Sequence, residues 1–318
     1  MSPLALAACA ALFLFSACAA GGTLPEVAVE HNTAGAESLA AGELDDAEAR
    51  FRLALEYHPG FAESRANLGL VAFQRGQLDD AEGHLRAAIR LDANFDEAWS
   101  NLGLVLAAKG QIRDAKRAFE TALAIDPGLV AARRNLADLN MRESNYVEAR
   151  AHLMRLVQIV EASTADGARA SAMLAYSELR LGREEEALYR AQVVLNVRPD
   201  ESLARLVRGI AHAASQDFEA AAEDYAIASF DTKLRRDVQI RQAALYLAWG
   251  RPEEAAPIIT VLLNDGEEAA VCLLAAHLAL AEDNPDAALE HAHAALQATP
   301  GLPAALEVAS RARSELDR

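Results

Sequence analysis

Apolar and small residues recur along this chain at a fixed interval. Residues 67–77 read NLGLVAFQRGQ, and residues 101–111 read NLGLVLAAKGQ, 34 positions later. One alanine marks nearly the same interval from end to end, at Ala47, Ala81, Ala115, Ala149, Ala187, Ala221, Ala255 and Ala288. The pattern predicts an array of about eight similar units that share one continuous core, because a single short unit cannot bury its own apolar face.

Within each unit the pattern predicts two helices. A second small residue stands twelve positions before each marker alanine, at Gly35, Gly69, Gly103, Ala137, Ala175, Gly209, Ala243 and Ala276. No alternation of apolar and polar residues indicates strands. A glycine turn such as Lys109-Gly110-Gln111 separates the two helices, and small residues on both let their backbones approach closely.

The unit at residues 96–129 contains a set of residues at characteristic spacings: Trp99, Leu102, Gly103, Leu106, Ala115, Phe119, Ala122 and Pro127. In these residues the unit resembles the tetratricopeptide repeat. The resemblance implies an all-α, right-handed superhelical solenoid of about eight helix-turn-helix units, with a concave groove lined by the first helix of each unit. Residues 303–316 then read as a capping helix, with Ala305, Ala309 and Leu316 facing inward.

The sequence also predicts the domain boundaries. We expect a signal peptide with a lipobox at residues 1–18, on the N-terminal features described below, and a short linker at 19–27. Units one to four occupy 28–163, and units five to eight occupy 168–302, before the capping helix at 303–318. The step from Ala149 to Ala187 is longer than the steps before and after it, which indicates an insertion at 164–167. A longer turn could absorb it, or the solenoid could bend there.

The N-terminus indicates export. Residues 1–22, MSPLALAACAALFLFSACAAGG, carry no charged side chain, and their apolar run is too short to span a bilayer. The segment Phe15-Ser16-Ala17-Cys18 resembles the lipobox of bacterial lipoproteins, which implies a lipid anchor on Cys18 and sorting to the outer membrane, facing the periplasm. Phe15 replaces the usual Leu and no Lys or Arg precedes the run. Plain secretion into the periplasm and a misassigned start therefore remain alternatives.

Charge and motifs argue against several functions. The formal net charge of -17 disfavours binding to nucleic acid and to anionic lipid. Much of this charge falls where second helices begin and complements the helix dipole. No catalytic or metal-binding motif is present, and His291 and His293 would point apart on a helix. We therefore expect a non-enzymatic binding protein with no cofactor, no metal and one core cysteine, Cys272.

A repeated asparagine marks the candidate binding site. Asn67, Asn101 and Asn135 occupy the sixth position of consecutive units, at the edge of the concave face. A row of amides could hold the backbone of an extended peptide, since each offers one acceptor and two donors. Alternatively, each amide bonds a neighbouring helix.

Other first-helix positions complete the predicted groove. They are Glu63, Leu70, Phe73, Gln74, Glu97, Ser100, Leu104, Arg134, Asp138, Met141, Arg142, Arg169, Tyr176 and Arg180. An apolar and amide-lined front thus leads to an arginine-bearing middle, which could bind a partner carboxylate. The alternative is that these are ordinary exposed arginines.

The resemblance suggests two functions. An exported, lipid-anchored repeat array is similar to the pilotins of type IV pili and to related lipoproteins of secretion and motility machines. This predicts a protein-binding scaffold that helps an outer-membrane machine assemble, with a protein or peptide segment in the groove. The alternative is a soluble periplasmic chaperone or a regulatory adaptor of a cell-wall enzyme.

Overall fold

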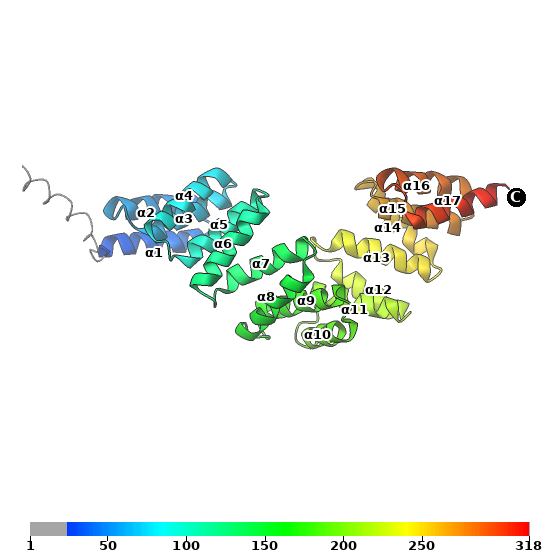
Figure 1. Cartoon of the computed structure of the whole chain (residues 1–318), viewed down its shortest axis with the longest axis horizontal. Helices are drawn as coiled ribbons and strands as arrows, with labels where there is room; N and C mark the ends of the chain where they lie inside the picture. The colour runs from blue at the N-terminus through cyan, green and yellow to red at the C-terminus, as the bar shows by residue number, and fades with distance from the viewer. Residues whose placement is uncertain (1–23, 318) are drawn as a thin grey trace, which may run out of the picture. The chain divides into compact units, whose positions relative to one another are not determined.

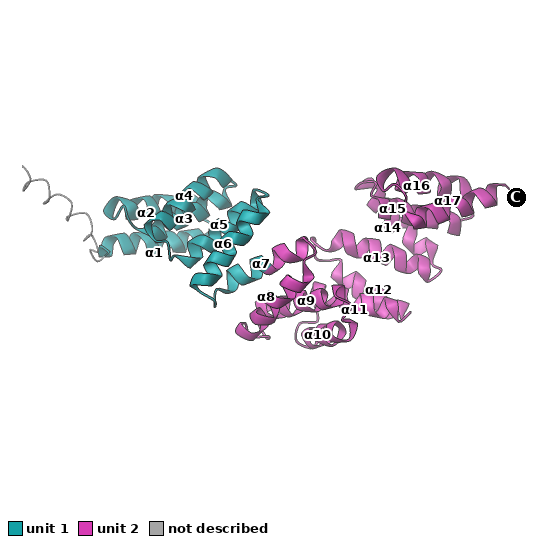
Figure 2. Ribbon diagram, in the orientation of Figure 1, with its two compact units in different colours: residues 1–136 teal, residues 137–318 magenta. Residues whose placement is uncertain are grey.

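The computed structural model describes residues 24–317, and within them the chain is an all-α repeat solenoid (Figure 1). The chain divides into two compact units, residues 1–136 and 137–318, which are called unit 1 and unit 2 from here on (Figure 2). The single repeats within them are called helix pairs. Cys18 and the rest of the predicted signal peptide lie outside the described residues. None of the described helices is both long enough and apolar enough to cross a membrane.

Unit 1 consists of three complete helix pairs and the start of a fourth. Its helices are α1 (Glu26–Ala41), α2 (Leu44–Tyr57), α3 (Ala62–Gln74), α4 (Leu78–Leu91), α5 (Asp96–Ala108), α6 (Ile112–Ile125) and the first part of α7 (Val130–Arg142). Each pair packs on the next, so that residues of three helices meet in one cluster. Ala28 of α1, Phe51 of α2 and Val71 of α3 are all almost fully buried there.

Unit 2 begins within α7 and continues the same pattern. Its helices are α8 (Tyr146–Ile159), α9 (Ala165–Arg180), α10 (Glu184–Val197), α11 (Ser202–Ala214), α12 (Phe218–Ala228), α13 (Arg235–Ala248), α14 (Pro252–Asn264), α15 (Ala269–Ala281), α16 (Pro285–Ala298) and α17 (Pro303–Leu316). Cys272 is buried against α16 and α17, and this burial raises the pKa of its thiol.

The turn inside each helix pair uses one residue in the left-handed region. Five are glycines with φ between 74° and 80°: Gly42, Gly76, Gly110, Gly182 and Gly250. The other three are Ser144, Gln216 and Asp283, with φ of 60°, 62° and 57°. The backbone of the turn is therefore the same in all eight pairs, although the glycine that favours it is missing from three.

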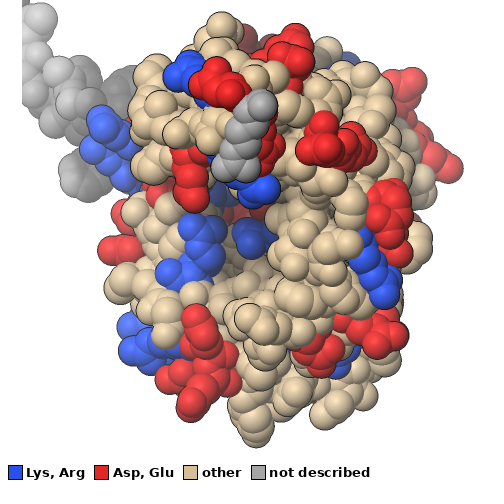
Figure 3. Space-filling view, turned by 90° about the vertical axis from the view of Figure 1, so that its right-hand side faces the viewer, with Lys and Arg blue, Asp and Glu red and all other residues tan. Residues whose placement is uncertain are grey.

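The charge placement predicted from the sequence is confirmed. The second helix of each pair, from α2 to α16, carries an acidic residue in its first turn, for example Asp79 and Asp80 in α4. Carboxylates there offset the positive end of the helix dipole. On the face drawn in Figure 3, acidic side chains are spread over the surface with basic side chains among them.

The four extra residues between the fourth and fifth pairs mostly lengthen a helix. Helix α9 is 16 residues long, whereas α3, α5 and α7 are each 13. Thr164 caps α9 by accepting a hydrogen bond from the backbone N–H of Gly167 at 3.1 Å. A Cβ on Gly167 would lie 2.0 Å from the carbonyl oxygen of Glu161, so the close turn requires glycine. The insertion is thus absorbed locally, by one more helical turn.

The capping helix differs from the prediction at its end. Ala305 and Ala309 face inward as expected, joined by Val308 and Ala312. Leu316, also predicted to face inward, is 42% exposed. Ala312 already packs on Ala288 in the first turn of α16, so the next turn of α17 has passed the end of its neighbour.

Candidate partner-binding face

The first asparagine of the predicted row is held by the preceding helix pair. Asn67 on α3 donates its Nδ2 to Oδ1 of Asn32 on α1 at 3.1 Å. Asn32 is only 3% exposed; it also accepts from the Ser64 hydroxyl at 2.9 Å and donates to a Glu63 carboxylate oxygen at 2.8 Å. The side chains of Asn67 and Glu63 therefore join α1 to α3.

The other two asparagines are not held in this way. Asn101 on α5 and Asn135 on α7 are half-buried, and their side chains make no hydrogen bond to any residue between 24 and 317. The residue 35 positions before Asn67 is Asn32, whereas the corresponding residues are Ala66 for Asn101 and Ser100 for Asn135. Alanine offers no acceptor. The Ser100 hydroxyl is buried and forms no hydrogen bond within the described residues.

The remaining predicted residues of unit 1 line the same helices. Leu70, Phe73 and Leu104 are half-buried and Gln74 is exposed, so they present apolar surface beside a polar edge. Arg134 is half-buried and is not a free cation. Ser100 was expected in the groove, but it is only 3% exposed.

Glu97, which precedes Asn101 by one helical turn, is exposed at the start of α5. Partial burial and the neighbouring Asp96 raise the pKa of its carboxyl group.

In unit 2, two predicted arginines are already paired. Arg142 and Asp138 form an exposed ion pair along α7 at 2.8 Å. Arg169 on α9 lies 3.0 Å from Glu201 at the start of α11 and 3.6 Å from Asp231, so it joins neighbouring helix pairs. These carboxylates leave little positive charge for a partner.

Arg180 has a different environment. Its Nη1 donates to the hydroxyl oxygen of Tyr176 on the same helix at 3.2 Å. Its guanidinium carbon lies 4.8 Å from the ring centre of Tyr146 on α8, a residue that the sequence did not indicate as part of the site. The rings of Tyr146 and Tyr176 meet edge to face with centres 6.3 Å apart. No carboxylate among residues 24–317 lies within 4 Å of this cation.

Two buried carboxylates of unit 2 were also missed. Glu178 on α9 is 2% exposed and receives two hydrogen bonds from Arg190 on α10, at 2.9 and 3.2 Å. Asp224 on α12 is 1% exposed and binds Arg205 and Arg208 of α11. Each buried carboxylate is thus paired with arginine from the other helix of its own pair. One sequence signal could have indicated the buried Asp224: its partner Arg208 occupies a position where this repeat normally has leucine.

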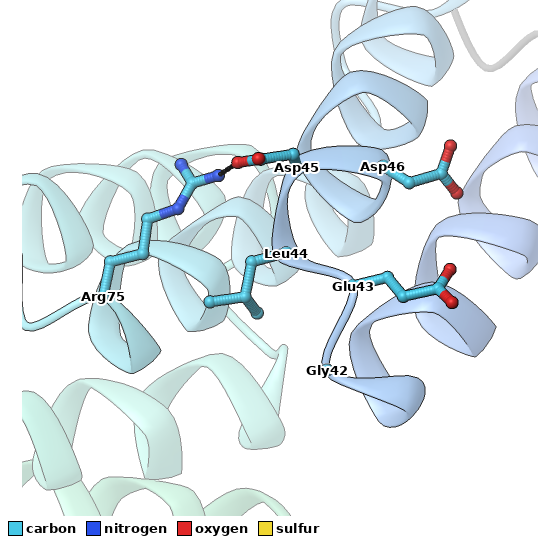
Figure 4. A pocket seen from close by; sticks show the side chains of 6 residues that line it. All are labelled: Gly42, Glu43, Leu44, Asp45, Asp46 and Arg75. Atoms are coloured by element: carbon cyan, nitrogen blue, oxygen red, sulfur yellow. Dashed lines mark hydrogen bonds and ion pairs between the residues drawn. The ribbon is translucent and has the colours of Figure 1, made fainter.

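The surface depression at the α1–α2 turn is structural. Figure 4 shows Arg75 beside Asp45 at its edge. Arg75, which ends α3, donates to Asp45 at 2.5 Å and to Glu48, both on α2. One repeat later, Lys109 binds Asp79 at 2.7 Å and Glu82 at 2.6 Å. The same cation-to-two-carboxylate contact therefore joins consecutive pairs, and these residues stabilise the stack.

Comparisons with known proteins define the repeat. One tetratricopeptide-repeat family model matches residues 38–103 and a second matches residues 96–129. No curated protein sequence matches the chain. The helix pairs define a helical-repeat protein. More specifically, residues 38–129 match the tetratricopeptide repeat, and the helix pairs of the other described residues follow the same pattern. This fold suggests a scaffold for protein–protein interaction.

Several solved structures resemble this chain at low sequence identity. The Cut9–Hcn1 hetero-tetramer of the APC/C matches with a TM-score of 0.68 and 16% identity, over 85% of this chain and 52% of that one. This chain thus spans about half of the length of that relative. The pilF protein of Pseudomonas aeruginosa matches with a TM-score of 0.49 and 18% identity, over 79% and 97% of the two chains. A tetratricopeptide-repeat protein from Parabacteroides merdae matches with a TM-score of 0.47 and 16% identity, over 91% and 100%. The similarity to the Cut9–Hcn1 structure concerns the fold alone.

Proposed function

We propose that this protein is a non-enzymatic scaffold that binds an extended segment of a partner protein along its first helices. The observation that carries this proposal is the pair of half-buried amides, Asn101 and Asn135, without a bonding partner in the described residues. An amide held at a surface can bond a passing peptide backbone without reading its side chains. Leu70, Phe73 and Leu104 offer apolar contacts beside them.

We further propose that the scaffold acts in the bacterial cell envelope, anchored in the outer membrane through a lipid on Cys18. The support is the sequence FSAC at residues 15–18, after an apolar run of signal-peptide length. Assembly of a pilus, secretion or motility machine is the function that fits an anchored scaffold. A soluble periplasmic chaperone or adaptor is the second candidate, because Phe15 departs from the usual lipobox.

Recovery of partners from solubilised outer membranes tests the binding face. The full chain should recover a component of such a machine, and Asn101→Ala with Asn135→Ala should lose it while the melting temperature stays unchanged. Asn94→Ala is the matched control, because Asn94 is exposed on the α4–α5 connection. Recovery of lipoprotein-sorting factors alone would contradict the proposal.

Metabolic labelling with palmitate tests the anchor separately. We expect the label on the wild-type protein and none on Cys18→Ala, which should also move to the soluble fraction. A wild-type protein that takes up no label and is released with the periplasm would instead support the soluble adaptor.

A further inference from the structure

The cation at Arg180 is left unpaired by a change between two consecutive repeats. In the fourth pair, Asp138 and Arg142 stand four positions apart and neutralise each other at 2.8 Å. In the fifth pair, the equivalent positions on the first helix are Tyr176 and Arg180. The aspartate has become a tyrosine, so the arginine keeps its position without a counter-ion.

Aromatic contacts hold this cation in place. The guanidinium lies over Tyr146, and its Nη1 is occupied by the Tyr176 hydroxyl. Nε and Nη2 make no hydrogen bond to the described residues. These two atoms form one edge of the planar group, the edge that binds both oxygens of a carboxylate. Rings that fix the guanidinium beforehand reduce the entropy lost when a ligand binds.

The surrounding charges leave Arg180 available to an anionic group. One carboxylate, Asp237 of α13, acts on Arg180 electrostatically, and it is itself paired with Arg241 at 3.1 Å. The whole chain carries a net charge of -17. An unpaired, exposed arginine is therefore a specific point of attraction on a surface that otherwise repels acidic ligands.

We propose that Arg180, braced by Tyr146 and Tyr176, binds a carboxylate of the partner, which is an acidic peptide segment. This inference rests on the proposed binding function and gives its partner a chemistry. The carboxylate lies against the Nε–Nη2 edge of Arg180, with the tyrosine rings beside it. Arg169, which the sequence placed in the same role, is occupied by Glu201 and Asp231.

A matched pair of peptides tests the proposal on the full chain. The probes are a capped peptide of alternating Glu and Leu and the same peptide with Gln in place of Glu. The Glu peptide should shift the Nε–Hε resonance of Arg180, assigned by its loss in Arg180→Lys, and the Gln peptide should not. Arg180→Gln should weaken Glu-peptide binding about tenfold, the loss expected for a charged bidentate contact. Tyr146→Phe should retain binding and Tyr146→Ala should reduce it.

Arg155→Gln is the control, because Arg155 is an exposed arginine of α8 that makes no contact of this kind. Equal losses in Arg155→Gln and Arg180→Gln would overturn the proposal, since they would indicate general charge attraction. Inorganic phosphate that shifts the Arg180 resonance as strongly as the Glu peptide at equal concentration would also overturn it. If Arg180→Gln still recovers the membrane partner while the Asn101 and Asn135 variant does not, the scaffold proposal stands and this one fails.

Discussion

Gly103 on α5 lies directly against the ring of Phe119 on α6: a Cβ at Gly103 would stand 2.6 Å from Cε1 of Phe119. The same sequence spacing joins Gly35 to Phe51, Gly69 to Leu85 and Gly209 to Tyr225. Where the first helix has alanine instead, the residue at that spacing is never aromatic: it is Leu153, Ala191, Ile259 or Ala292. At this one position of the second helix, an aromatic ring therefore occurs only opposite glycine among the described helix pairs, and the missing Cβ lets the ring lie against the first helix.

Replacement of Gly103 by alanine should therefore destabilise the protein. The added methyl meets a fully buried ring, and overpacking of this kind costs about 1–3 kcal/mol. Chemical denaturation should show the loss. The control is Gly83→Ala on α4, where a Cβ meets nothing within 4 Å. Because alanine is the better helix former, that variant should gain about 0.5–1 kcal/mol. Equal effects of the two substitutions would contradict the packing argument.

At the turn residues with left-handed backbone, a substitution to glycine and a substitution from glycine should change the free energy of unfolding in opposite directions. Gln216 has φ of 62°, a conformation that costs a residue with a Cβ about 1–2 kcal/mol. Gln216→Gly should therefore raise the free energy of unfolding, by about 1 kcal/mol. Gly110→Ala, at φ 75°, should lower it by a similar amount. Thermal unfolding of both variants measures this, and a destabilised Gln216→Gly would show that its side chain matters more than its backbone.

The contact between Lys109 and Glu82 predicts a pH dependence of stability. Hydrogen bonds from Lys109 and Arg86 lower the pKa of the Glu82 carboxyl from its ordinary 4.5. A carboxyl with a lowered folded-state pKa stabilises the fold above its ordinary pKa, and that contribution disappears as the pH falls through the lower value. Glu82→Gln should thus lose stability at neutral pH and show a weaker dependence on pH in the acid range.

Glu97 should show the opposite pH dependence of stability to Glu82, because its pKa is raised rather than lowered. Partial desolvation of its exposed carboxyl group and the neighbouring Asp96 raise the pKa of Glu97, so its ionisation destabilises the fold as the pH rises through the raised value. Glu97→Gln should be more stable than wild type at neutral pH, measured by urea unfolding at a series of pH values. Parallel behaviour of the two glutamine variants would refute the assignment.

The three asparagines should separate into two classes. Asn67→Ala removes a hydrogen bond to the buried Asn32 and should lower stability by about 1 kcal/mol. Asn101→Ala should leave the melting curve nearly unchanged, since its amide bonds no described residue. Circular dichroism melts of the single variants test this difference, and a large loss in Asn101→Ala would indicate that its amide stabilises the fold.

The start of α9 depends on a cap and on one glycine. Thr164→Ala removes the acceptor for the Gly167 N–H and should cost about 1 kcal/mol, whereas Thr164→Ser should keep the cap. Gly167→Ala places a methyl 2.0 Å from the Glu161 carbonyl oxygen and should cost more, about 2–3 kcal/mol. Hydrogen exchange of the first α9 amides should increase in Thr164→Ala and remain unchanged in Thr164→Ser.

The sequence by itself determined the repeat and the helices. A nearly constant repeat interval with small residues at two positions is a local pattern, and Ala47 and Ala81 are buried because the helices pair there. Glycine at Gly42, Gly76 and Gly110 likewise identifies the turns, because few other residues favour that backbone. The prediction of which capping-helix residues face inward was correct except in the last turn, where Leu316 extends beyond the neighbouring helix.

Only the tertiary structure decided which polar side chains are available to a partner. Asn67 and Asn101 occupy identical positions in the repeat, yet one is bonded to Asn32 and the other has Ala66 at the corresponding position. Arg169 and Arg180 share a helix, yet one is paired with Glu201 and the other contacts two tyrosine rings. A repeat pattern gives each residue its position, but its bonding partner comes from another helix, distant in sequence, and hydrogen bonds and ion pairs depend on that partner.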